Sequence, residues 1–127
     1  MSNRRKILLI DDETDIQTVV KIGLTLNTDW IITTANSGET GLELAIASPP
    51  DAILLDVAMP GMDGLATLSA LQKNTVTAHV PIIFLTAKAQ AADRRRLYEA
   101  GASGVITKPF DPTTLASQIA GFLAWTL

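Results

Sequence analysis

Short apolar runs alternate along this chain with segments whose apolar residues recur at helical spacing, and this alternation limits the fold more than any other feature. Five runs of mainly β-branched and aliphatic residues are candidate strands: 7–10, 31–35, 52–55, 82–85 and 105–106. Continuous apolar runs of this length are typical of parallel strands that are covered on both faces. Because a candidate helix follows each run, the pattern predicts an α/β fold with a parallel sheet between two layers of helices.

Five stripes of apolar side chains, spaced to fall on one face of a helix, define the candidate helices. The stripes are Ile16, Val19, Val20 and Leu24; Leu42, Ala45 and Ile46; Leu65, Leu68 and Leu71; Leu97 and Ala100; and Leu115, Ile119 and Phe122. Ser37 is placed to cap the second helix, and Gly101 is placed to end the fourth. Asp111 followed by Pro112 predicts the cap and the first residue of the fifth helix.

Composition narrows the function classes before any motif is considered. The 127 residues include no cysteine, which excludes disulfides, thiolate metal sites and cysteine nucleophiles. The net charge of −3 disfavours non-specific binding of nucleic acid by the surface as a whole. Apolar runs of about four residues are far shorter than the ~20 that span a bilayer. We therefore expect one cytoplasmic domain over residues 1–127, without direct contact to nucleic acid or membrane.

Polar side chains stand at the ends of four of the five candidate strands. Asp11 and Asp12 follow the first strand, Asp56 ends the third, Thr86 the fourth and Lys108 the fifth. In an open parallel sheet, ligands bind beyond the carboxyl ends of the strands, where the strand order reverses. These five side chains are therefore predicted to share one crevice at that edge of the sheet.

Three carboxylates in one crevice repel one another, so the arrangement calls for a cation or for an acid with a raised pKa. Oxygen ligands favour a hard divalent ion, and Mg²⁺ suits the site best because it keeps bound water and bridges to phosphate oxygens. Asp56 could then attack a phosphoryl group and form an acyl phosphate. Mg²⁺, the Lys108 ammonium and the Thr86 hydroxyl would stabilise the charge on the phosphoryl oxygens.

Four motifs, taken together in order and spacing, resemble the receiver domain of two-component response regulators. They are LLIDDE at 8–13, LDVAMPGMDG at 55–64, LTA at 85–87 and KP at 108–109. The resemblance extends from residue 6 to about residue 123. It implies a flavodoxin-like, doubly wound, five-stranded parallel sheet with strand order 2-1-3-4-5.

The resemblance also implies roles for the acidic residues. Asp56 would be the phosphoacceptor and a ligand of Mg²⁺. Asp12 would bind Mg²⁺ directly, and Asp11 would act through a water molecule. The backbone carbonyl of Ala58 would be a further ligand of the metal.

Residues at the ends of the fourth and fifth strands would read the phosphorylated state. The resemblance implies that Thr86 moves to bond the phosphoryl group and that Lys108 pairs with the same group. It also implies a cis peptide bond between Lys108 and Pro109, which would aim the lysine side chain inward. Val105 stands where many receivers carry Tyr or Phe, which makes a ring flip impossible as part of the switch. Lys88, like Ala58, would flank the phosphoryl group and influence its lifetime.

The function implied by the resemblance is signalling rather than turnover of a separate substrate. A sensor histidine kinase or a histidine phosphotransfer protein would transfer a phosphoryl group to Asp56 in a Mg²⁺-dependent reaction. The face formed by the fourth helix, the fifth strand and the fifth helix would then change and bind a downstream protein. The length fits a stand-alone receiver that is a monomer or a weak, phosphorylation-dependent dimer.

Three other functions on a similar fold are weighed against this one. An aspartyl phosphatase needs a second Asp two residues after the nucleophile, where this chain has Ala58. A flavodoxin-type nucleotide module needs a loop rich in glycine and hydroxyl groups after the first strand, where this chain has the acids of residues 11–13. A pseudo-receiver that is never phosphorylated normally lacks part of the acid, Thr and Lys set, which is complete here.

Overall fold

Five parallel strands form one sheet in the order β2-β1-β3-β4-β5 in the computed structural model, which describes residues 4–88 and 90–127. The strands are β1 (Lys6–Ile10), β2 (Ile31–Ala35), β3 (Ala52–Asp56), β4 (Ile82–Thr86) and β5 (Gly104–Thr107). The helices are α1 (Thr14–Asn27), α2 (Gly38–Ala47), α3 (Gly64–Lys73), α4 (Ala91–Ala100) and α5 (Leu115–Leu123). The predicted alternation, strand order and flavodoxin-like fold are therefore confirmed.

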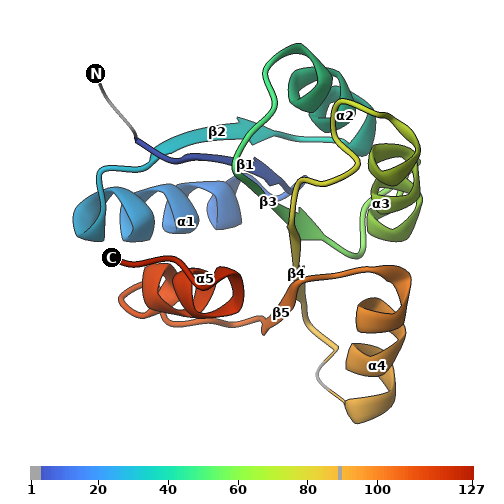
Figure 1. Ribbon diagram of the computed structural model, residues 1–127. Coiled ribbons are helices and arrows are strands. Elements are labelled where there is room, and N and C mark those ends of the chain that lie inside the picture. The colour runs from blue at the N-terminus through green and yellow to red at the C-terminus, as the bar shows by residue number, and fades with distance from the viewer. Residues whose placement is uncertain (1–3, 89) are drawn as a thin grey trace.

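The sheet separates two hydrophobic cores, because successive side chains of a strand point to opposite faces. Ile7 and Leu9 of β1 pack on one side, with α1 and α5, and Leu8 and Ile10 pack on the other, with α2, α3 and α4. Figure 1 shows the same two helical layers on either side of the sheet. Complete burial of one such side chain stabilises the fold by about 1.5–3 kcal/mol.

The three central strands are more deeply buried than the edge strand β2. All five residues of β3 and of β4 are buried, whereas burial alternates along β2 and Ile31 is exposed. The polar end residues Asp56 and Thr86 thus belong to strands that are held rigidly from both faces. A slip of one residue would exchange their side chains between the two cores.

Two predicted helix boundaries are confirmed. The Ser37 side chain accepts a hydrogen bond from the N–H of Thr40 and caps α2. Gly101 ends α4 in the left-handed conformation, at φ +119°, and its N–H donates to the last turn of the helix. A residue with a Cβ would be strained at this φ, so glycine provides the stop.

The predicted start of the fifth helix at Pro112 is wrong, because α5 begins at Leu115. A carboxylate oxygen of Asp111 accepts hydrogen bonds from the backbone N–H and the hydroxyl of Thr113, at 2.9 and 2.7 Å. This local bonding holds residues 112–114 in a turn that competes with the helix. Asp111 therefore caps a turn rather than α5.

Three side chains of the predicted apolar stripes are exposed rather than buried. They are Val19, Ile46 and Phe122, with exposed fractions of 38%, 36% and 39%. The Phe122 ring lies directly over Gly104 of β5, where even a Cβ would clash with it.

The two ends of the described chain meet at the side of the sheet opposite the polar strand ends. Trp125, beyond α5, packs edge-on against the buried Trp30, with ring centroids 5.4 Å apart. The Arg5 guanidinium lies 4.0 Å from the centre of the Trp125 ring, which is a cation–π contact. Within residues 4–88 and 90–127, no helix is both long and apolar enough to cross a membrane.

Candidate functional site

The sheet register brings the predicted polar residues together at its carboxyl edge. Ile10 of β1 pairs with Leu55 of β3, so Asp11 and Asp56 follow side by side at the point where the strand order reverses. Thr86 ends β4 next to β3, and Lys108 directly follows β5. The prediction that these side chains approach one another is borne out for Asp11, Asp56 and Lys108 by their direct contacts.

Lys108 connects the acidic residues of the site. Its Nζ donates to Oδ2 of Asp11 at 3.0 Å, to Oδ1 of Asp56 at 3.2 Å and to Oε1 of Glu13 at 3.4 Å. The lysine side chain is only 12% exposed, so these contacts are partly shielded from water. Charge-assisted hydrogen bonds of this kind are stronger than neutral ones.

Asp11 is fully buried and is held through both its backbone and its side chain. Its N–H donates to the carbonyl of Ala35 at 3.0 Å, which extends the pairing of β1 with β2 by one residue. Its Oδ1 accepts from the N–H of Glu13 at 2.9 Å, and its carbonyl accepts from Nε2 of Gln17 at 2.6 Å. These three hydrogen bonds fix the backbone of the acidic loop.

Burial and crowding of negative charge shift the ionisation of all three connected groups. Burial raises the pKa of Asp56 to about 6, with a further rise from the charge of Asp11 that Lys108 partly offsets. Burial also raises the pKa of Asp11. Burial alone would lower the pKa of Lys108, but its bonds to Asp11 and Asp56 outweigh this and raise it. The single positive charge of Lys108 does not balance the three carboxylates that it contacts, so the site keeps an excess of negative charge.

We expect the stability of the metal-free protein to carry a signature of Asp56 between pH 4 and 7. The pKa of an ordinary aspartate is 3.8, and that of Asp56 in the folded protein is about 6, so folding favours the protonated acid. The contribution of Asp56 to the free energy of unfolding is fully present below about pH 4. It is lost as the pH rises through 6, and the loss is on the order of 2–3 kcal/mol. Urea unfolding of wild type and Asp56→Asn, both with a chelator, should show a difference in unfolding free energy that grows across this range. A difference independent of pH would contradict the assignment.

Thr86 and Lys88 stand beside the acidic cluster at the end of β4. Thr86 is buried, and its hydroxyl oxygen accepts from the N–H of Lys88 at 3.0 Å. Both residues line a cavity of about 540 Å³ that extends between the loop after β3 and the helix α4. Ala58 and Arg96 line the same cavity, so Thr86 links the cluster to the surface of α4.

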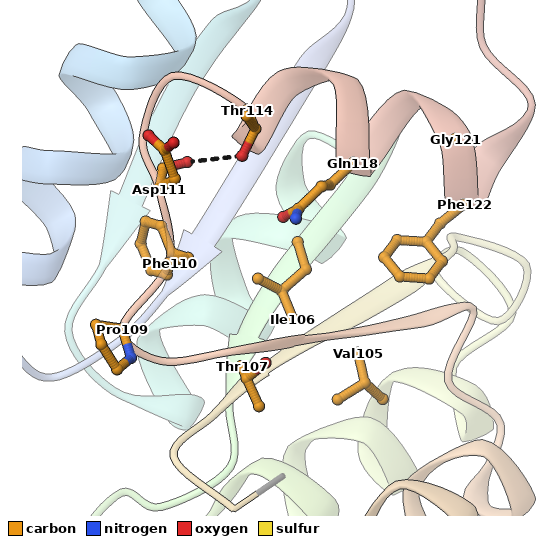
Figure 2. A pocket seen from close by; sticks show the side chains of 10 residues that line it. All are labelled: Val105, Ile106, Thr107, Pro109, Phe110, Asp111, Thr114, Gln118, Gly121 and Phe122. Atoms are coloured by element: carbon orange, nitrogen blue, oxygen red, sulfur yellow. Dashed lines mark hydrogen bonds between the residues drawn. The ribbon is translucent and has the colours of Figure 1, made fainter.

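Val105 and Pro109 line a second cavity, of about 530 Å³, between β5 and α5 (Figure 2). Figure 2 shows the rings of Phe110 and Phe122 toward its two ends. The Lys108–Pro109 peptide bond is cis. The segment that follows β5 thus places Lys108 in the acidic cluster and also lines this second cavity.

Comparison with known proteins decides the family. Residues 7–120 match the family model of the response regulator receiver domain. The chain belongs to this family. The resemblance inferred from the four motifs is therefore confirmed.

Curated relatives carry this receiver domain within longer chains. The response regulator PleD of Caulobacter vibrioides is 37% identical over 114 residues, which is 90% of this chain and 25% of PleD. The DNA-binding dual master transcriptional regulator RpaA of a Synechocystis strain is 33% identical over 121 residues, 95% of this chain and 50% of RpaA. The chain thus spans half or less of the length of these relatives.

Solved structures share the whole receiver fold. The chemotaxis response regulator CheY4 of Vibrio cholerae superposes with a TM-score of 0.88 at 28% identity, covering 94% of this chain and 99% of that one. A second structure of CheY4, crystallised at low pH, gives a TM-score of 0.86 with 98% of its chain covered.

The acidic cluster of this receiver domain fits a divalent cation. Ligand oxygens of Asp11, Asp12, Glu13 and Asp56 lie within 4.8 Å of one another, and two of these acids are buried. Receiver domains bind Mg²⁺ at an acidic pocket, and an all-oxygen set beside an excess of negative charge suits that ion. The N–H of Ala58 points to Oδ1 of Asp56 at 3.4 Å, and the ligand role of its carbonyl stays a prediction.

Two residues of the receiver site carry contacts that sequence reasoning did not assign. Glu13 continues the acidic run, and its contact with Lys108 could have been anticipated from that position. Gln17 lies on α1 and bonds the backbone of Asp11. A polar residue on an amphipathic helix has no distinguishing pattern, so no feature of the sequence points to the role of Gln17.

Proposed function

We propose that Asp56 accepts a phosphoryl group, in a Mg²⁺-dependent reaction, from the phosphohistidine of a sensor histidine kinase or a histidine phosphotransfer protein. The observation that carries the proposal is the position of the Asp56 carboxylate, which is buried at the end of β3 and bonded to Lys108 beside Asp11. The protein would promote its own phosphorylation and dephosphorylation, and would not act on a separate substrate. Family membership supports this choice of phosphodonor.

The proposed transfer follows from the groups at the site. A carboxylate oxygen of Asp56 forms a bond to phosphorus while the phosphorus–nitrogen bond of the donor breaks. The electron pair remains on the imidazole nitrogen, so the histidine leaves as neutral imidazole when its other ring nitrogen carries a proton. With a pKa of about 6, Asp56 is mostly the nucleophilic carboxylate at neutral pH. Mg²⁺, when bound, would neutralise charge on the phosphoryl oxygens.

Lys108 and Thr86 would then hold the phosphorylated state. The Lys108 ammonium, which bonds Asp56 in the free protein, is placed to pair with an added phosphoryl oxygen. The Thr86 hydroxyl would exchange its bond with the N–H of Lys88 for one with that group. Because Val105 has no ring, we propose that this exchange repacks aliphatic side chains of the α4–β5–α5 face, which then binds a downstream protein.

Thr86→Ala should separate phosphorylation from switching. We expect the variant to bind a phosphoryl mimic such as beryllofluoride at Asp56, yet to lose most of the resulting amide chemical-shift change over α4, β5 and α5. Thr34→Ala, on the distant strand β2, is the matched control and should switch like wild type. Shifts of wild-type size across α4 in Thr86→Ala would show that the signal travels by another route.

The cellular setting is part of the proposal. We place the protein in the cytoplasm, as a monomer or a weak dimer that forms on phosphorylation, with a protein rather than nucleic acid as the direct target of this domain. RpaA and PleD continue well beyond the matched region. The stand-alone organisation expected from the length therefore stays a prediction.

Intact mass spectrometry tests the proposed function. The protein is incubated with phosphoramidate or acetyl phosphate in the presence of Mg²⁺, and in parallel with excess chelator. A gain of ~80 Da, for one phosphoryl group on a carboxylate, is expected only with Mg²⁺. A pseudo-receiver would show no gain and no affinity for beryllofluoride, and either absence would contradict the proposal.

A further inference from the structure

The loop between β1 and α1 is held by two side chains that bond its backbone. Oδ1 of Asp11 accepts from the N–H of Glu13 at 2.9 Å, and Nε2 of Gln17 donates to the carbonyl of Asp11 at 2.6 Å. Glu13 is the N-cap of α1 but makes no capping bond with its side chain, which instead contacts Lys108. The first turn of α1 is already closed by the N–H of Gln17 and the carbonyl of Glu13, at 3.1 Å. The hydrogen bond from the Gln17 side chain is therefore additional to those that form the helix.

The carbonyl that Gln17 bonds belongs to the peptide group joining Asp11 to Asp12. A peptide group is planar, so fixing its carbonyl direction also fixes where the next Cα lies. The preceding peptide group is already fixed, because the N–H of Asp11 donates to the carbonyl of Ala35. With Gln17 in place, both peptide groups around Asp11 are held, and the direction in which Asp12 leaves the strand is set.

We propose that Gln17 is a positioning residue for the divalent cation site, which it serves by holding the Asp11–Asp12 peptide group so that the acidic side chains meet. The inference rests on the proposed function, because it assumes that these acids bind Mg²⁺. The proposed role requires a hydrogen-bond donor at position 17 that reaches a backbone carbonyl. The glutamine side chain provides one, because two methylene groups carry its carboxamide to that carbonyl. Methionine has a similar length but cannot donate, which makes it the discriminating substitution.

Gln17→Met and a matched control, Gln72→Met, test the inference on the full chain. Gln72 also donates from a helix to a backbone carbonyl, that of Ala100 at 3.0 Å, but at the far end of α4. The Mg²⁺ dissociation constant is measured by titration calorimetry, with the Mg²⁺-induced rise in melting temperature as a second readout. Without metal, Gln17→Met should melt roughly 3–6 °C lower, and Gln72→Met should lose less because its hydrogen bond is exposed. Only Gln17→Met should bind Mg²⁺ about tenfold more weakly, which is the size of effect expected for a lost outer partner of a metal ligand.

A Gln17→Met protein that binds Mg²⁺ as tightly as wild type would overturn the inference. If that variant does not fold, Gln17→Asn replaces it, because it keeps the amide but is too short to reach the carbonyl. A wild-type dissociation constant for Gln17→Asn would overturn the inference equally. Failure of wild type itself to bind Mg²⁺ would instead overturn the proposed function, so the two failures are distinguishable.

Discussion

Replacing Asp56 by asparagine should abolish the Mg²⁺-dependent mass gain and leave the fold intact. Asparagine has almost the same shape as aspartate, but its amide is not a nucleophile toward phosphorus. Lys108 keeps its bond to the buried Asp11, so the variant does not leave the lysine without a partner. Loss of a buried carboxylate whose pKa is raised to about 6 should even stabilise the metal-free protein at neutral pH.

Asp51→Asn is the matched control for this experiment. Asp51 precedes β3 at the opposite end of the strand, where its carboxylate accepts from the N–H of Lys6 at 2.7 Å. The substitution is chemically the same but lies far from the acidic cluster, so labelling should match wild type. Full labelling of Asp56→Asn would disprove the assignment of the phosphoacceptor.

Replacing Asp12 by alanine should remove most of the affinity for Mg²⁺. The loss should be at least as large as the ~10–100-fold that follows removal of an outer partner of a metal ligand, because Asp12 is expected to bind the ion directly. The rise in melting temperature on adding Mg²⁺ should largely disappear, and phosphorylation should slow accordingly. Without metal, the variant should be at least as stable as wild type, because one of the mutually repelling acids is gone.

Asp15→Ala controls for the loss of negative charge near the site. Asp15 lies in the first turn of α1, and its carboxylate is outside the cluster formed by Asp11, Asp12, Glu13 and Asp56. We expect its Mg²⁺ affinity to stay close to that of wild type. Wild-type affinity in Asp12→Ala would show that the ligand assignment is wrong.

The parts of the fold that the sequence predicts are those fixed by burial on both faces. The runs that became β3 and β4 are continuous and apolar, as expected for strands covered on both faces. Asp56 and Thr86 end these runs, so their positions at the sheet edge follow from the strand order. Asp11 and Lys108 follow for the same reason, because each directly succeeds a strand. Parallel strands bring their carboxyl ends together, and this made the candidate site predictable from spacing.

The parts that were not predicted depend on individual side-chain bonds. Asp111 could have capped a helix, and only the competing bonds to Thr113 place it in a turn. Gln17 looks like any polar residue of an amphipathic helix until its side chain is seen against the carbonyl of Asp11. Phe122 matches the helical spacing of its stripe, but its ring lies over Gly104, which has no Cβ to displace it, and the side chain stays 39% exposed.

Locating the phosphoryl group on the chain tests the central claim most directly. Protein treated with phosphoramidate and Mg²⁺ is exposed to hydroxylamine, which converts an acyl phosphate into a hydroxamate, and is then digested for peptide mass analysis. We predict a hydroxamate at Asp56, and none when Mg²⁺ is replaced by a chelator. A modification at another acid such as Asp12, or a phosphoryl group that resists hydroxylamine, would contradict the account.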